Sequence, residues 1–136
     1  MIFSKSVFYD TSAWVALYDE SDDEHEEATR THQKIATERH LIVTSNFVFS
    51  ETHAYFSRFP REALKIGEAL RSSRILSYQR VSPEDEEKAW ALLKKYKDKD
   101  FSFCDATSFI LIERLKIPAA FSFDHHFEQY GISVVP

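Results

Sequence analysis

The sequence contains very little glycine and cysteine. Only two of its 136 residues are glycine, so few backbone positions can take a positive φ angle at low cost, and a glycine-rich phosphate-binding loop is excluded. The single cysteine, Cys104, cannot form an internal disulfide. No apolar run is long enough to span a membrane, and no signal-peptide pattern opens the chain. We therefore expect a soluble, cytoplasmic protein with no membrane partner.

The composition fits one small folded domain. With 43% hydrophobic and 15% aromatic residues, the chain can fill one core but is too short for two ordinary domains, so we expect a single domain over residues 1–136. The net charge of −5 at first argues against a nucleic-acid partner, because phosphate contacts favour Lys and Arg. Basic residues are nevertheless concentrated in the middle of the chain: Arg58, Arg61, Lys65, Arg71, Arg74 and Arg80. Such stretches are more often solvated helix faces than a phosphate-binding track, unless a metal site accompanies them.

Short segments rich in β-branched and aromatic residues alternate with longer helical patterns. We predict strands over residues 6–9, 41–44, 75–81, 119–123 and 132–135. We predict helices over residues 12–18, 24–39, 46–59, 61–72, 83–97 and 103–115, with serine caps and prolines marking several of their ends. Strands separated by helices need crossover connections. This order therefore predicts an α/β fold with a mostly parallel sheet covered by helices on both faces.

Four acidic residues interrupt otherwise apolar stretches: Asp10, Glu51, Asp105 and Asp124. A carboxylate flanked by core-forming side chains loses hydration on folding, which is unfavourable unless a partner charge, hydrogen bonds or a metal compensates. The chain has no matching set of Lys or Arg beside them. If the four converge at separations of about 5 Å, each pair repels by roughly 3 kcal/mol at an effective dielectric constant of about 20. Divalent cations would relieve that repulsion.

The predicted topology brings at least two of these acids to one edge of the sheet. Asp10 and Asp124 directly follow predicted strands, and ligands of open α/β sheets bind at the carboxyl ends of the strands. Glu51 lies one helical turn from Phe47 and one from Tyr55, so we expect it on a stripe that faces the core. A carboxylate on a buried stripe is unfavourable without a partner, so its presence indicates a functional role.

Each acid also has a purely structural explanation. Ser102 and Asp105 have the spacing of a capping box, in which Asp105 only satisfies a backbone N–H at a helix start. Asp10 and Asp124 could cap the turns that follow their strands. Glu51 has no capping role in the middle of its helix, and its structural alternative is an ion pair with a buried Arg. One shared cause accounts for the four acids more simply than four separate ones.

Hydroxyls and histidines stand beside these acids in the sequence. Thr11 follows the first acid and Ser122 precedes the last by two residues, so either could donate a hydrogen bond that orients a carboxylate, or be an ordinary turn residue. His125 and His126 directly follow the last acid and could act as a general acid or contact phosphate. Because adjacent residues point in different directions, we interpret them as surface residues of a loop.

The ordered set of motifs resembles the PIN-domain nucleases, and within them the VapC-type toxins of bacterial and archaeal toxin–antitoxin pairs. Residues 7–12 resemble the family's opening strand, which ends in Asp-Thr/Ser-Ser/Asn. Residues 22–28 resemble its Asp-x-x-His-x-x-Ala motif, which we interpret as structural. Glu51 matches the family's helical Glu, Asp105-Ala106 its helix-opening Asp-Ala, and residues 122–127 its final Thr/Ser-x-Asp motif. The scarcity of glycine departs from the family but touches no acidic position.

The resemblance implies a three-layer α/β/α fold and RNA cleavage that depends on Mg²⁺ or Mn²⁺. It implies that Asp10, Glu51, Asp105 and Asp124 are both the catalytic and the metal-binding residues. Hard divalent ions favour carboxylate oxygens, and they let an acidic cavity receive a phosphodiester. The resemblance also implies an antitoxin partner and a homodimer. We expect the apolar surface for self-association near residues 47–59 and 61–72, with Arg58, Arg61 and Lys65 along an RNA path.

Three other functions compete with a toxin-like ribonuclease. A phosphatase with an aspartyl nucleophile would resemble Asp-x-Asp at its first strand, whereas this chain has Asp10-Thr11-Ser12. A larger structure-specific DNA nuclease would need further helices to clamp its substrate, and 136 residues leave no room for them. A non-catalytic PIN-like protein that binds RNA or a partner would keep the fold without needing all four acids.

Overall fold

The computed structural model describes residues 5–72, 74 and 76–136. Within them, five strands form one parallel sheet in the order β3-β2-β1-β4-β5. The strands are β1 (Ser6–Tyr9), β2 (Leu41–Ser45), β3 (Leu76–Gln79), β4 (Ala119–Phe121) and β5 (Val134–Val135). The first strand lies at the centre, where Phe8 pairs with Val43 on one side and Ala120 on the other. The predicted α/β class with a parallel sheet is confirmed.

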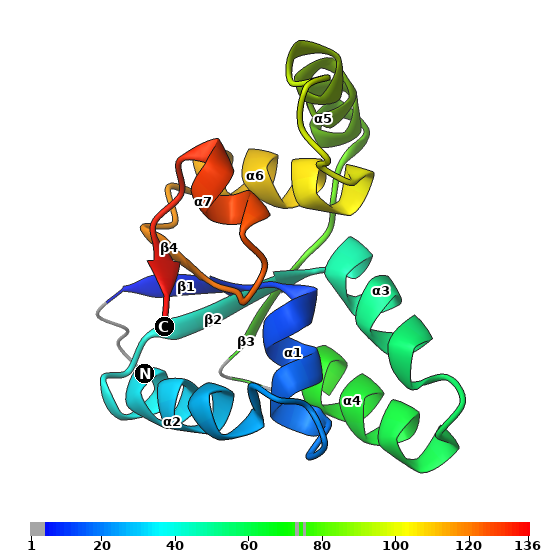
Figure 1. Ribbon diagram of the computed structural model, residues 1–136, viewed down its shortest axis with the longest axis vertical. Helices are drawn as coiled ribbons and strands as arrows, with labels where there is room; N and C mark the ends of the chain where they lie inside the picture. The colour runs from blue at the N-terminus through cyan, green and yellow to red at the C-terminus, as the bar shows by residue number, and fades with distance from the viewer. Residues whose placement is uncertain (1–4, 73, 75) are drawn as a thin grey trace.

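Helices pack on both faces of the sheet and make three layers. They are α1 (Thr11–Tyr18), α2 (His25–Thr37), α3 (Asn46–Phe56), α4 (Pro60–Ser72), α5 (Pro83–Lys95), α6 (Phe103–Leu115) and α7 (His126–Tyr130). Figure 1 shows α1, α2 and α4 below the sheet, α6 and α7 above it, and α5 projecting beyond α6. After Ser6 the central strand is apolar at every position, as expected when both faces are covered, and Phe8 and Tyr9 are fully buried.

Most predicted elements are present with small shifts at their ends. The strand over 6–9 and the helix over 103–115 have the predicted bounds, whereas α3 ends at Phe56 and α5 at Lys95, each earlier than predicted. Ser45 caps α3, since its hydroxyl accepts the N–H of Val48 at 3.1 Å. The strand predicted over 75–81 is β3, with residue 75 outside the described residues. Helix α7 was not predicted, because five residues are too few to show a helical hydrophobic period.

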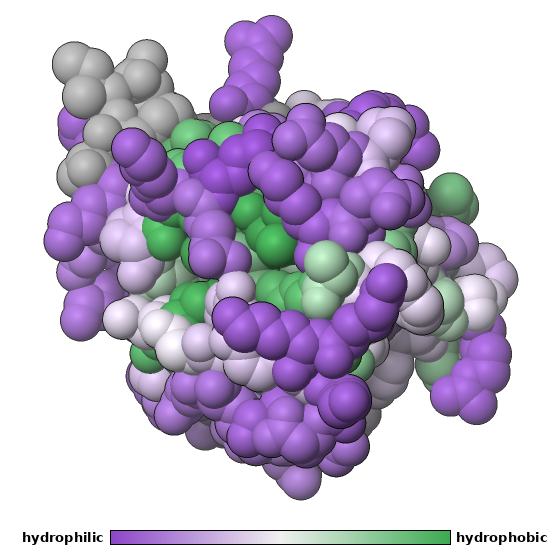
Figure 2. All heavy atoms as spheres, turned by 90° about the horizontal axis from the view of Figure 1, so that it is seen from above, coloured by the Kyte–Doolittle hydropathy of each residue, from purple (hydrophilic) through white to green (hydrophobic). Residues whose placement is uncertain are grey.

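Apolar side chains remain on part of the surface. Seen from above, hydrophilic side chains cover most of one face, and apolar ones are visible in a hollow near its middle (Figure 2). Large hydrophobic side chains are exposed at Tyr55, Phe59, Leu64 and Trp90. Three of these four lie on α3, on α4 or in the turn between them, as the sequence predicts. In the part of the chain that the structure describes, no helix combines the length and the apolar character needed to cross a membrane.

Candidate active site

Asp10 stands where the central strand ends. It directly follows β1, occupies the N-cap position of α1 and is 4% exposed. Its backbone N–H donates to the carbonyl of Phe121 on β4 at 3.1 Å, which fixes the chain as it leaves the sheet. Its side chain does not cap α1. The carboxylate is therefore placed at the carboxyl edge of the sheet, where ligands of parallel sheets bind.

Two serine hydroxyls hold the carboxylate of Asp10. Ser12 Oγ and Ser122 Oγ each donate to its Oδ2 at 3.0 Å. Ser122 Oγ also accepts the backbone N–H of Asp124 at 2.9 Å. One hydroxyl thus links two of the acids that the sequence singles out, and it is the hydroxyl expected there.

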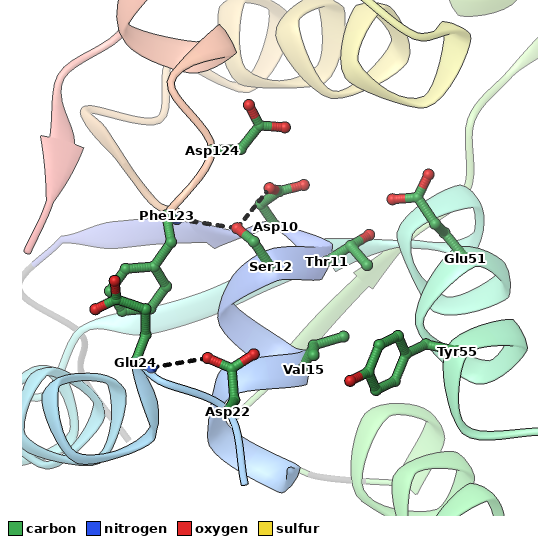
Figure 3. Close-up of a pocket in the computed structure, with 10 residues that line it drawn as sticks. All are labelled: Asp10, Thr11, Ser12, Val15, Asp22, Glu24, Glu51, Tyr55, Phe123 and Asp124. Atoms are coloured by element: carbon green, nitrogen blue, oxygen red, sulfur yellow. Dashed lines mark hydrogen bonds between the residues drawn. The ribbon is translucent and has the colours of Figure 1, made fainter.

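The hydroxyl of Thr11 does not make the contact expected of it. It is buried, and among the described residues it has no hydrogen-bond partner. Figure 3 shows its side chain on the Glu51 side of Asp10, because Thr11 begins α1 and the helix turns its side chain away from the neighbouring serine. Ser12, one residue later, takes the place predicted for Thr11.

Asp105 belongs both to a helix cap and to the acidic site. Its Oδ2 accepts the N–H of Ser102, and Ser102 Oγ accepts the N–H of Asp105, each at 3.0 Å. The capping box weighed as an alternative is therefore present. The same Oδ2 lies 3.0 Å from Nδ1 of His126, which comes from the far side of the site. Capping does not exclude Asp105 from the site, because one carboxylate contacts both.

Asp124 lies in the turn between β4 and α7. Its Oδ1 accepts the backbone N–H of His126 at 3.0 Å and lies 3.1 Å from Nδ1 of the same residue. The interpretation of both histidines as loop-surface residues is wrong for His126, which begins α7, is mostly buried and bridges Asp105 and Asp124. It holds for His125, whose side chain is 73% exposed. The two histidines differ because His125 is the N-cap residue of α7 and His126 is the first residue of the helix, which is too short to be evident from the sequence.

Glu51 reaches the site from α3. The prediction that it lies on a buried stripe is wrong, since Glu51 is exposed and Tyr55, one turn later, is 46% exposed. Figure 3 shows the Glu51 carboxylate across an open space from Asp10 and Asp124. The residues that α3 does bury are Val48, Thr52 and Phe56. Glu51 therefore faces the site because it is on the open side of the helix.

Burial makes ionisation of the central acids, Asp10 and Asp105, unfavourable. It raises the pKa of Asp10 to about 7, and the charge of Asp105 adds to the rise. Burial also raises the pKa of Asp105, where the charge of Asp124 acts in the same direction and that of His126 opposes it. The hydrogen bonds that these carboxylates accept do not offset the lost hydration.

Another buried acid shows what a cationic partner would do. Asp85 is 1% exposed, and burial raises its pKa, but the two hydrogen bonds of 2.9 Å from Arg114, the hydrogen bonds with Ser82 and the charge of Arg114 together outweigh burial and lower it. Asp10 has no such guanidinium partner within the described residues. The thiol of Cys104 also reports the negative field, since burial and then the charges of nearby acids, Glu51 first, raise its pKa. A raised pKa disfavours the thiolate form that a cysteine nucleophile needs.

The acids border an open cavity of about 350 Å³. Its lining includes three of the four predicted acids, Asp10, Glu51 and Asp124, together with Asp22 and Glu24. Figure 3 shows the last two farther from the sheet, in the segment between α1 and α2. The sequence analysis did not assign them to the site, although Asp22 begins the motif that we interpret as structural. Asp105 stands beside this cavity, joined to Asp124 through His126.

The carboxylates are candidate ligands for a divalent cation. In three of them the hydrogen bonds described above fall on one oxygen: Oδ2 of Asp10, Oδ2 of Asp105 and Oδ1 of Asp124. In Asp105 and Asp124 these bonds leave the second oxygen to a ligand, whereas the Asp10 carboxylate also has a hydrogen bond with the backbone of Thr11. Hard divalent ions prefer such oxygens, and a cation would also relieve the charge that burial makes unfavourable. The ligand atoms of Asp124, His125 and His126 also lie within 4.8 Å of one another.

Comparison with known proteins identifies relatives over nearly the whole chain. The PIN domain family model matches residues 7–132. The 23S rRNA-specific endonuclease VapC20 of Mycobacterium tuberculosis is 33% identical over 126 residues, which are 92% of this chain and 94% of the relative. The crystal structure of VapC20, described as a sarcin–ricin loop cleaving toxin, superposes with a TM-score of 0.86 at 32% identity, covering 93% of this chain and 96% of the other.

More distant structures share the fold. A toxin–antitoxin complex from Klebsiella pneumoniae matches with a TM-score of 0.71 at 17% identity, covering 96% of this chain and 97% of the other. FitAcB from Neisseria gonorrhoeae matches with a TM-score of 0.69 at 11% identity, covering 96% of each chain. At these identities the likeness concerns the fold alone. The family match and the identity to VapC20 go further, and they show that this chain belongs to the PIN domain family, among its VapC-type toxins.

Proposed function

We propose that the protein is a divalent-metal-dependent endoribonuclease and the toxin of a type II toxin–antitoxin pair. The observation that carries this proposal is the convergence of Asp10, Asp105 and Asp124 around buried negative charge that no Arg or Lys compensates in the described residues. Glu51 completes the set from the opposite wall of the cavity. The protein acts as one nuclease domain over residues 1–136, in the cytoplasm.

The residues proposed to hold the ion, Mg²⁺ or Mn²⁺, are Asp10, Glu51, Asp105 and Asp124. A bound ion of this kind supplies a water of lowered pKa as nucleophile and stabilises the leaving oxygen. Ser12 and Ser122 hold Oδ2 of Asp10, which limits rotation of a carboxylate that lines the cavity. All four proposed ligands bind through carboxylate oxygens, which suit Mg²⁺ and Mn²⁺ better than softer metals.

The proposed substrate is 23S rRNA. This follows from VapC20, which is specific for that RNA by name and is 33% identical over 92% of this chain. Arg58, Arg61 and Lys65 are exposed and are proposed to contact phosphates. Lys65 lines a second cavity of about 540 Å³, and Tyr55 lines both this cavity and the acidic one. RNA could therefore extend from the acids toward α4 along a continuous surface.

An antitoxin and a second copy of the chain are the proposed protein partners. The support for an antitoxin is the relation to VapC-type toxins and the fold shared with a toxin–antitoxin complex. The support for a homodimer is the exposed apolar side chains of Tyr55, Phe59 and Leu64.

The test is cleavage of purified 23S rRNA by protein stripped of metal. Cleavage should appear when Mg²⁺ or Mn²⁺ is added and disappear with EDTA. A Glu51→Gln variant purified in the same way controls for contaminating nuclease, since it should cut nothing. Cleavage that persists in EDTA would contradict the metal-dependent mechanism. A folded protein that cuts neither this RNA nor others with either ion would favour the non-catalytic, RNA- or partner-binding alternative.

A further inference from the structure

His126 connects two of the acids that come from different parts of the fold. Its Nδ1 lies 3.0 Å from Oδ2 of Asp105, at the start of α6, and 3.1 Å from Oδ1 of Asp124, in the turn after β4. The imidazole is 16% exposed and packs edge-on against Phe101, with ring centroids 5.7 Å apart at 84°. The ring is therefore held in place independently of the two carboxylates.

The chemistry of the two contacts assigns the hydrogen on the ring. Ionised carboxylate oxygens only accept hydrogen bonds, so Nδ1 of His126 carries the hydrogen and donates it to Oδ2 of Asp105, while Oδ1 of Asp124 lies 3.1 Å from the same nitrogen. The backbone N–H of His126 makes a second hydrogen bond, to Oδ1 of Asp124. His126 thus donates one hydrogen bond to each acid, from its ring to Asp105 and from its backbone to Asp124.

We infer that His126 is a positioning residue that holds Asp105 and Asp124 together, ready for a divalent ion. The inference rests on the proposed metal-dependent function and concerns how the same site is prepared. Asp105 and Asp124 repel each other, and a donor between them reduces the free energy needed to keep them close before the ion arrives. Because His126 occupies Oδ2 of Asp105 and Oδ1 of Asp124, the opposite oxygens remain for the ion.

A competing role for His126 is that of a metal ligand itself, with His125 and Asp124. Ligation by Nδ1 requires a lone pair on that atom, whereas both of its neighbours are carboxylate oxygens that favour a hydrogen there. His125 is 73% exposed, and its Nδ1 is 3.8 Å from Oδ1 of Asp124, too far for a hydrogen bond. The geometry therefore favours a hydrogen-bonding role for His126 over ligation.

The test measures Mn²⁺ binding by electron paramagnetic resonance, with metal-stripped protein and no RNA. His126→Ala should weaken Mn²⁺ binding about 10- to 100-fold, as loss of a group that orients metal ligands usually does. His126→Asn should restore most of the affinity, since the Asn amide nitrogen falls near the position of Nδ1. His126→Gln places its amide farther along the side chain and should not restore it. Thermal unfolding followed by circular dichroism checks that each variant is folded.

The control is His125→Ala, which should bind Mn²⁺ as the wild-type protein does. Equal losses in the Asn and Gln variants would overturn the inference, and so would a loss in His125→Ala as large as that in His126→Ala, which would make the histidines ligands. If His126→Ala does not fold, the comparison of Asn with Gln still decides. A wild-type protein that binds Mn²⁺ but cuts no RNA would remove the proposed activity and leave the role of His126 intact.

Discussion

Ser12 and Ser122 are separated by 110 positions in the chain, yet their hydroxyl oxygens lie 3.2 Å apart. Both donate to the same oxygen of Asp10. Ser12 Oγ also accepts the backbone N–H of Phe123 at 2.9 Å, so it joins the first turn of α1 to the segment after β4. The Asp10 carboxylate is thus fixed from two strand ends that only the parallel sheet brings together.

Removing the hydroxyl of Ser12 should disturb the site more than removing the hydroxyl of Thr11, its neighbour in sequence. Ser12→Ala leaves the N–H of Phe123 without its acceptor, which we expect to lower the free energy of unfolding by about 1–3 kcal/mol. It also frees Asp10 to rotate, so RNA cleavage should fall by about 10- to 100-fold. The control is Thr11→Val, which removes a buried hydroxyl that has no partner among the described residues and should change neither property. Urea unfolding and initial cleavage rates measure the two effects, and equal behaviour of the two variants would contradict the assignment.

The raised pKa of Asp10 predicts how pH affects the metal-free protein. Its folded pKa of about 7 exceeds the ordinary value of 3.8. Between these values the folded state binds a proton that the unfolded state has lost, so the free energy of unfolding decreases as pH rises, and above pH 7 the whole penalty applies. The difference between the two pKa values corresponds to as much as about 4 kcal/mol, and relaxation around the charge makes the measured effect smaller.

Asp10→Asn should therefore stabilise the metal-free protein in alkaline solution. We expect a higher Tm than wild type at pH 8 and a difference that shrinks as pH falls toward 3.8, where the folded carboxyl is protonated and the unfolded one is becoming so. Adding Mn²⁺ at pH 8 should raise the Tm of the wild type and not that of the variant. A variant less stable than wild type at pH 8 would mean that the charge of Asp10 is compensated in some other way.

Asp105 and Ser102 share a capping box but should affect different properties. Asp105→Asn keeps a side-chain oxygen for the N–H of Ser102, so we expect a small change in Tm and loss of RNA cleavage. Ser102→Ala removes the hydroxyl that accepts the N–H of Asp105, which should lower stability by about 1 kcal/mol and leave most of the cleavage. If Asp105→Asn loses stability and keeps activity, capping is the main role of Asp105.

The sheet and most of the site could be predicted from the sequence because both depend on local patterns. Asp10 ends an apolar strand, and the alternation of strands and helices fixes which sheet edge it faces. Helix starts such as Ser45 were also predictable, since a cap is encoded within a few residues. The VapC-type resemblance then assigned roles to the acids that spacing alone left open.

The remaining parts of the site depend on contacts that sequence order does not encode. His126 is near Asp105 only because α7 folds back against α6. The prediction that Glu51 is buried was wrong because Phe47 and Tyr55, its neighbours by helical spacing, are not the residues that α3 buries. Asp22 enters the cavity through a loop between α1 and α2, whose path no period or cap predicts. A stripe of aromatic residues is thus weak evidence for a buried face when the helix is short and lies at the edge of a site.

The exposed apolar side chains on and between α3 and α4 predict self-association. Phe59 is 51% and Leu64 is 71% exposed, and burying such groups against a second copy is favourable. Light scattering at micromolar concentration should give twice the 15.9 kDa mass of one chain. Leu64→Glu should shift the protein toward the monomer, because a charge would have to be buried in the interface.

Two controls decide whether this surface, rather than another, forms the dimer. Lys34→Glu changes an exposed charge on α2 and should leave the mass unchanged. Trp90→Glu changes the exposed aromatic side chain of α5; if it dissociates the dimer and Leu64→Glu does not, the interface lies on α5. In that case, or if the wild type is strictly monomeric, Arg58, Arg61 and Lys65 of two chains do not line a shared RNA path. Each would then contact RNA only beside the acids of its own chain. In a dimer joined through α5, substituting them in one subunit would therefore impair cleavage by that subunit alone.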